Sequence, residues 1–169
     1  MRETGLKTFM LALILGVVAA GGRAAAAAKP ALPASVVQTV DGVPVALNDG
    51  VVDGQWLVLY VVPDSPPSVR LLDALRTWQV PALDRVLVVV GGPAAPAATF
   101  ARAQQQRGLD TVRWRLDGDR AAWTDLAASG VPTLFGVGAG VLEWRLAGVL
   151  NDPSALQSVV ASWLSTTAP

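Results

Sequence analysis

Two uninterrupted apolar runs constrain the fold of this chain more than any other feature. Residues 56–62 read WLVLYVV and residues 86–90 read VLVVV. Strands that are buried on both faces carry near-continuous apolar sequence, so these runs predict two central strands of a covered sheet. A helix is predicted between them, because apolar residues recur there at helical spacing. These residues are Leu71, Leu72, Leu75 and Trp78.

The remaining segments extend this pattern of strands and helices. Further strands are predicted at residues 36–39, 43–47, 112–116, 133–137 and 141–146, and further helices at residues 96–107, at residues 120–129 and from Pro153 onward. The turns at Asp41-Gly42 and at residues 138–140 predict β-hairpins at the start and the end of the domain. Asn151-Asp152 is expected to cap the last helix, where the buried stripe is expected to be Leu156, Val159, Val160, Trp163 and Leu164.

The order of elements predicts an α/β fold with a central mixed, mainly parallel sheet and helices on both faces. The strands at residues 56–62, 86–90 and 133–137 are expected to be neighbours at its centre. In the strand at residues 112–116, Arg113 and Arg115 alternate with apolar residues. This alternation predicts an edge strand with one exposed face.

The N-terminus is typical of an export signal. A weakly basic start precedes the apolar run of residues 9–20 and an alanine-rich stretch at residues 24–28, and the run is short for a membrane span. We therefore predict a signal peptide at residues 1–28, a lead-in at residues 29–34 and a single domain at residues 35–169. The expected location is the periplasm or another compartment outside the cytoplasm. The alternative is an uncleaved segment that anchors the chain to the inner membrane.

Two missing residue types exclude most enzyme chemistry. The chain contains no cysteine and no histidine among its 169 residues. Without cysteine there is no thiolate, disulfide or zinc–thiolate site, and without histidine there is no imidazole base or imidazole metal ligand. Acidic and basic residues are balanced at 13 each, so nucleic acid is not an expected partner. No catalytic residue, metal or cofactor is predicted.

Four segments resemble the exported TlpA/redoxin branch of the thioredoxin-like superfamily, over most of residues 35–165. Asp41–Leu47 resembles its N-terminal strand pair, and residues 56–75 resemble its strand, active-site loop and first helix. Residues 130–133 (GVPT) resemble the loop that carries its cis-proline, and residues 96–116 resemble its inserted helix and strand. In this alignment Ser65-Pro66-Pro67-Ser68 occupies the place of a Cys-Pro-Pro-Cys motif.

The resemblance implies a thioredoxin-like fold without thioredoxin chemistry. Thiol–disulfide exchange requires a thiolate, and serine stands at both cysteine positions. Ser65 is expected to cap a helix, and Ser68 to be a solvated or capping first-turn residue. In the family the proline is cis, it faces the start of the first helix, and the backbone before it pairs with an extended substrate strand. Pro132 therefore either contributes to a groove or only shapes its loop.

The resulting hypothesis is a non-catalytic, redox-inactive module of the bacterial envelope that binds or scaffolds protein. Its partner is expected to be an envelope protein or an extended peptide segment. The hypothetical groove consists of Ser65, Pro66, Pro67, Ser68, Val131, Pro132 and Thr133. The alternatives are a structural subunit of a larger envelope assembly and an enzyme of unrelated chemistry on the same scaffold.

The six tryptophans suggest a cofactor or sugar site, and two aspartates suggest a calcium site. Four of the six tryptophans are expected in the core, whereas Trp144 is expected to be partly exposed. The four are Trp56, Trp78, Trp114 and Trp163. Asp117 and Asp119 flank Gly118 as in a calcium loop, but the other ligand positions are missing. A solvated turn is the expected structure there.

Overall fold

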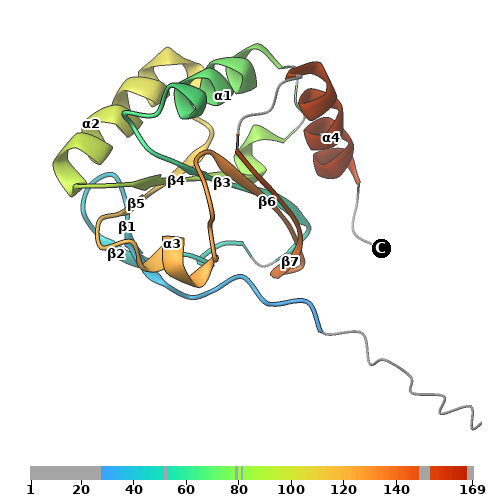
Figure 1. The fold of residues 1–169 in the computed structure, drawn as a ribbon, viewed down its shortest axis with the longest axis horizontal. Coiled ribbons are helices and arrows are strands. Elements are labelled where there is room, and N and C mark those ends of the chain that lie inside the picture. Colours follow the sequence, from blue (N-terminus) through green and yellow to red (C-terminus); the bar gives the residue numbers. More distant parts are fainter. Residues whose placement is uncertain (1–27, 52, 79, 81, 149–152, 167–169) are drawn as a thin grey trace, which may run out of the picture.

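The computed structural model describes residues 28–51, 53–78, 80, 82–148 and 153–166. A seven-stranded sheet in the order β2-β1-β5-β4-β3-β6-β7 runs through the domain. Figure 1 shows helices above and below this sheet. The predicted signal peptide and the predicted cap at Asn151-Asp152 lie outside the described residues.

The strands and helices follow the predicted order. The strands are β1 (Val36–Gln38), β2 (Pro44–Ala46), β3 (Gln55–Val61), β4 (Val86–Gly91), β5 (Arg113–Asp117), β6 (Thr133–Gly138) and β7 (Val141–Ala147). The helices are α1 (Pro66–Thr77), α2 (Ala94–Gln104), α3 (Ala121–Asp125) and α4 (Pro153–Ser165), with a 3₁₀ turn at Leu83–Arg85 and a π-helical turn at Gln105–Leu109. None of the helices in the described ranges is long and apolar enough to cross a membrane.

The sheet is mixed, as predicted, but it is not mainly parallel. Only β3–β4 and β4–β5 are parallel pairs, whereas β1–β2, β1–β5, β3–β6 and β6–β7 are antiparallel. The two terminal hairpins account for the difference, because each contributes an antiparallel pair and joins the central strands in antiparallel orientation. The prediction that β4, β3 and β6 are central neighbours is confirmed.

Each face of the sheet has its own apolar core. Alternate residues of β3 point to opposite faces: Leu57 and Leu59 join the core beneath α1, α2 and α4, and Val58 and Tyr60 join the core beneath α3. The helices therefore cover both faces, three on one and α3 on the other (Figure 1). This double coverage explains why β3 is apolar from Trp56 to Val61 and why β4 carries no polar side chain.

Strand β5 is not the edge strand that its alternating sequence predicted. It lies between β4 and β1, with Leu116 paired to Gln38 of the N-terminal hairpin. Arg113 is exposed, as expected, and lies over the indole of Trp56 at 4.6 Å, whereas Arg115 is half-buried. Burial lowers the pKa of Arg115. The alternation reports a polar face on which Arg113 donates a hydrogen bond to the carbonyl of Gly50 at 3.1 Å, and it does not report which strands flank β5.

The predicted lead-in is docked on the domain. Leu32 is 3% exposed, and its N–H donates to Gly140 at 2.8 Å. Ala31 bridges Val141 in antiparallel orientation, and Lys29 forms an ion pair with Glu143. This segment covers the first residues of edge strand β7 and thereby shields part of its unpaired backbone.

Candidate functional site

The two loops that the sequence singled out leave the sheet at the same edge. Tyr60 near the end of β3 pairs with Thr133 at the start of β6. The parallel order that a mainly parallel sheet predicts for these neighbouring strands is wrong, because β3 and β6 are antiparallel. Antiparallel order is what brings the end of one strand beside the start of the other. We call residues 62–68 and 130–133 the loop pair.

Ser65 begins helix α1 as predicted. Its backbone is extended, and its hydroxyl accepts a hydrogen bond from the Ser68 N–H at 3.4 Å. Pro66 and Pro67 follow at the first two helical positions, where a missing N–H leaves no helical bond unmade. The loop therefore leads directly into a capped helix whose N-terminus lies at the edge of the sheet.

Ser68, predicted to be either a solvated or a capping residue, is not solvated. It is fully buried, and its hydroxyl accepts a hydrogen bond from the Val62 N–H at 3.3 Å. That bond turns the backbone of Val62 away from the sheet and toward α1. Ser68 therefore fixes where β3 ends, which sequence reasoning missed because a serine in a first helical turn is usually exposed.

The loop before β6 is built around a cis bond between Val131 and Pro132. This is the isomer that the resemblance implies for Pro132. The carbonyl of Pro132 accepts from Gly148 N–H at 2.9 Å, and the Thr133 hydroxyl donates to the carbonyl of Gly130. Pro132 and Thr133 are buried, so both residues shape the loop rather than form its surface.

The backbone of Val131 is the polar group that the loop pair leaves open. Neither its N–H nor its C=O forms a hydrogen bond with any residue that the structure describes. The antiparallel ladder between β3 and β6 ends at the Tyr60–Thr133 pair and does not extend back to Val131. The Val62 N–H is bonded to the Ser68 hydroxyl instead. A backbone donor and acceptor on a half-buried residue are normally paired, with protein or with water.

The side chains of the loop pair are apolar and differ in exposure. Pro66 is exposed, Pro67 and Val131 are half-buried, and Pro132 is buried. Val62 and Val131 both pack on the core beneath α3. The seven predicted groove residues thus lie on two loops that flank adjacent strand ends. Direct side-chain contact between Pro132 and the Ser65–Ser68 turn stays a prediction.

A buried polar pair that sequence reasoning missed links the end of β3 to helix α3. Tyr60 donates its hydroxyl to Asp117 at 2.7 Å, and both side chains are at most 1% exposed. Asp117 also accepts from the N–H groups of Ala122 and Trp123, at 3.1 and 3.0 Å. Asp117 is therefore the anchor of α3 and not the solvated turn residue we expected. Burial, reinforced by the bond to Asp117, raises the pKa of Tyr60 far above its ordinary value.

The chemistry available at the loop pair is that of hydroxyls, prolines and backbone amides. Thiol chemistry is excluded by the absence of cysteine from the whole chain. Within the described ranges, no group of three or more acidic, cysteine or histidine residues is arranged to hold a metal ion. What the arrangement can do is present a backbone donor and acceptor beside an apolar turn.

Solved structures with the same architecture include a disulfide oxidoreductase and a thiol:disulfide interchange protein. DsbF of Mycobacterium tuberculosis superposes with a TM-score of 0.62 at 16% identity, covering 80% of this chain and 99% of its own. The chain has a thioredoxin-like fold. A thiol:disulfide interchange protein of the thioredoxin family from Chlorobium tepidum gives a TM-score of 0.58 at 15% identity, covering 83% of this chain and all of its own.

A third thioredoxin-like structure is a secreted Mycobacterium tuberculosis disulfide oxidoreductase homologous to DsbE of E. coli. Its TM-score is 0.61 at 13% identity, and the match covers 76% of this chain and 96% of that one. No protein-family model matches the sequence, and no curated protein is significantly similar to it. This chain therefore shares the thioredoxin-like fold but has no cysteine residue.

Proposed function

We propose that this thioredoxin-like domain is an exported, redox-inactive binding module that holds an extended peptide segment at the loop pair. The observation that carries the proposal is the unpaired backbone of Val131, beside the point where β3 turns away from β6. An extended peptide lying there continues the interrupted ladder and pairs with the Val131 N–H and C=O. Main-chain pairing of this kind supplies affinity without demanding one particular sequence.

The surroundings of Val131 favour a peptide with small or apolar side chains. Pro66 is exposed and Pro67 is half-buried, and neither carries a charge or a backbone donor. These prolines also restrict the backbone, so little conformational entropy is lost when a ligand packs on them. The hydroxyl of Ser65 caps α1, and the chain has no histidine that could activate it as a nucleophile.

The absence of thiols makes such binding reversible and independent of redox state. A cysteine-containing domain of this fold can trap a substrate as a mixed disulfide, whereas a serine cannot form that bond. Export is supported by the sequence of residues 1–28 and by the secreted neighbour of the same fold. In an oxidising compartment, a cysteine-free domain cannot itself be cross-linked through disulfides.

A pair of proline substitutions tests the site. Peptides are selected from a random library displayed on phage against residues 29–169, and their affinities are measured by calorimetry. Pro67→Trp places a bulky ring on the first turn of α1 in the loop pair and is expected to weaken a selected peptide at least tenfold. Pro96→Trp is the matched control, because Pro96 is an exposed proline in the first turn of α2. Equal affinity for both variants, with both folded, would place peptide binding elsewhere.

One observation favours the assembly alternative. Val36 and Val43, on the N-terminal edge hairpin, are 65% and 55% exposed. Exposed apolar residues on an edge hairpin are suited to contact with another subunit. If Val43→Asp dissociates a complex that Pro67→Trp leaves intact, the domain is a structural subunit that docks through β1–β2.

A further inference from the structure

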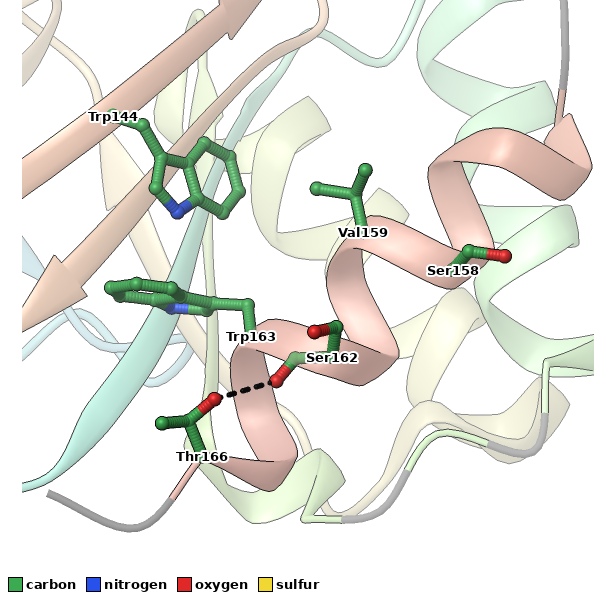
Figure 2. A pocket seen from close by; sticks show the side chains of 6 residues that line it. All are labelled: Trp144, Ser158, Val159, Ser162, Trp163 and Thr166. Carbon is green, nitrogen blue, oxygen red and sulfur yellow. Dashed lines mark hydrogen bonds between the residues drawn. The ribbon is translucent and has the colours of Figure 1, made fainter.

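A second candidate site lies between edge strand β7 and helix α4, away from the loop pair. Its walls are the side chains of Trp144 and Trp163, with Val159 at its rim (Figure 2). The pocket has a volume of about 400 Å³, within the range of small-ligand sites. It opens to solvent, and Val159 is 45% exposed.

The two indole rings are held in place by the protein. Trp163 donates its ring N–H to the carbonyl of Trp56 at 2.9 Å. Trp144 meets Trp163 edge to face, with ring centres 5.6 Å apart and planes at 82°. Trp144 also lies against Gly136 of β6, where a Cβ atom would come within 2.7 Å of its ring. A glycine inside a strand weakens it unless something approaches closely, and here Trp144 does.

Two side chains of the apolar stripe of α4 are more exposed than predicted. The apolar stripe of α4 predicted that Val159 and Trp163 would be buried with Leu156 and Val160. Instead, Val159 is exposed and Trp163 is half-buried, while Leu156 and Val160 are buried. Trp144 is half-buried, as predicted. An apolar surface with rigid walls therefore remains open to solvent.

The third wall is a row of hydroxyls along α4. Ser158, Ser162 and Thr166 are four residues apart and line the pocket together. Such a spacing places one hydroxyl about every 6 Å along a helix. Ser158 donates to the carbonyl of Ser154 at 3.1 Å, and Thr166 to that of Ser162 at 2.9 Å. Their oxygens keep the capacity to accept hydrogen bonds from a ligand.

We infer that this pocket binds a neutral saccharide ring. Among the described residues no charged side chain lines it, which disfavours anionic and cationic ligands. A pyranose has an apolar C–H face that packs on an indole ring and hydroxyls that donate to serine and threonine oxygens. The combination of an aromatic wall and a hydroxyl row matches those two surfaces of one ligand. This inference does not depend on peptide binding at the loop pair.

The test uses residues 29–169 with glucose, N-acetylglucosamine and cellobiose as probes, followed by ligand-observed NMR. For a ligand of this size we expect a dissociation constant on the order of 1 mM for at least one of them. Glucuronate, which carries a charge, and indole, which lacks hydroxyls, are the comparison ligands. If the protein is also retained on insoluble polysaccharide, the saccharide ligand belongs to a polymeric glycan. If the protein binds only the free sugars, the ligand is a soluble sugar.

Two serine variants on the same helix locate the site. Ser162→Arg fills the pocket and is expected to weaken sugar binding at least tenfold. Ser165→Arg is the matched control, because Ser165 is exposed on α4 but does not line the pocket; its affinity is expected to stay within twofold. The inference is overturned if none of the three sugars shows saturable binding at ten times the expected dissociation constant. It is also overturned if both variants bind sugar with equal affinity, or if indole binds more tightly than every sugar.

Discussion

Tyr60 and Asp117 form a buried hydrogen bond that crosses strand β4 and ties the central strand β3 to helix α3. Their oxygens are 2.7 Å apart, and the ring of Tyr60 passes over Gly91, the β4 residue that pairs with Asp117. Trp123 of α3 packs edge to face on Tyr60 at 5.1 Å. Since α3 precedes the loop that carries Val131, this pair helps to position one half of the loop pair.

Removing the Tyr60 hydroxyl is expected to destabilise the domain. Tyr60→Phe keeps the ring but leaves the buried Asp117 with one donor fewer, which costs about 1–3 kcal/mol of unfolding free energy. Urea denaturation monitored by tryptophan fluorescence measures the change. Thr124→Val, which removes an exposed hydroxyl of the same helix, is the control and is expected to change stability by less than about 0.5 kcal/mol. Equal stability of Tyr60→Phe and wild type would contradict the role of the pair.

The same hydroxyl predicts a loss of stability in alkali. The pKa of Tyr60 is raised above 10.0 in the folded state, first by burial and then by the bond to Asp117. Above pH 10, the unfolded chain releases this proton while the folded chain retains it. Stability should therefore be unaffected by Tyr60 below that pH and fall above it by about 1.4 kcal/mol per pH unit.

Tyrosine absorbance makes that loss directly measurable. Tyr60 is the single tyrosine of the chain, so absorbance at a tyrosinate wavelength reports its ionisation alone. Ionisation and unfolding should coincide in wild type, and the difference in alkaline stability between wild type and Tyr60→Phe should shrink as pH rises. Ionisation near pH 10 in the folded protein would contradict the account.

Gly91 is expected to be irreplaceable for a steric reason. A Cβ atom at this position would lie 2.8 Å from two carbons of the Tyr60 ring, and the ring is enclosed on all sides. Gly91→Ala should cost about 1–3 kcal/mol, as other overpacked core substitutions do. Gly118→Ala is the matched control, since no atom lies within 4 Å of a Cβ there. Thermal unfolding measures the effect, and equal midpoint temperatures for the two variants would contradict this steric explanation.

Hydrophobic pattern was sufficient to predict the centre of the fold. The continuous apolar runs identified β3 and β4 because strands buried on both faces have no polar side, and capping signals located the start of α1 at Ser65. The error at β5 has the opposite cause. Alternation reports one polar face but not which strands flank it, and here β5 is paired with β4 on one side and β1 on the other.

The candidate site was predicted less completely than the fold. Resemblance placed Ser65 and Pro132 at neighbouring strand ends, but the predicted mainly parallel sheet gave β3 and β6 the wrong relative direction. The burial of Ser68 and Asp117 was not predictable from their residue types, which are usually exposed. Both are buried because they accept hydrogen bonds from backbone N–H groups that the fold leaves unpaired.

Restoring cysteine tests whether the Ser65–Ser68 turn retains the geometry of a dithiol motif. Ser65→Cys with Ser68→Cys is expected to form an intramolecular disulfide in oxidised glutathione, because the two residues already approach within the first turn of α1. Mass spectrometry after alkylation counts the remaining thiols. Ser65→Cys alone is the control and should stay free of an internal disulfide. A double variant that remains reduced would show that the turn does not match the motif.

The most direct test of peptide binding at the loop pair is the hydrogen exchange rate of the Val131 amide. In the free domain this N–H has no hydrogen-bond partner among the described residues, so it is expected to exchange rapidly. Adding a selected peptide at a hundredfold excess over its dissociation constant should slow that exchange by about two orders of magnitude if the peptide pairs with it. Saturation with peptide while Val131 exchanges at its free rate, and protection arising at other amides, would contradict the account.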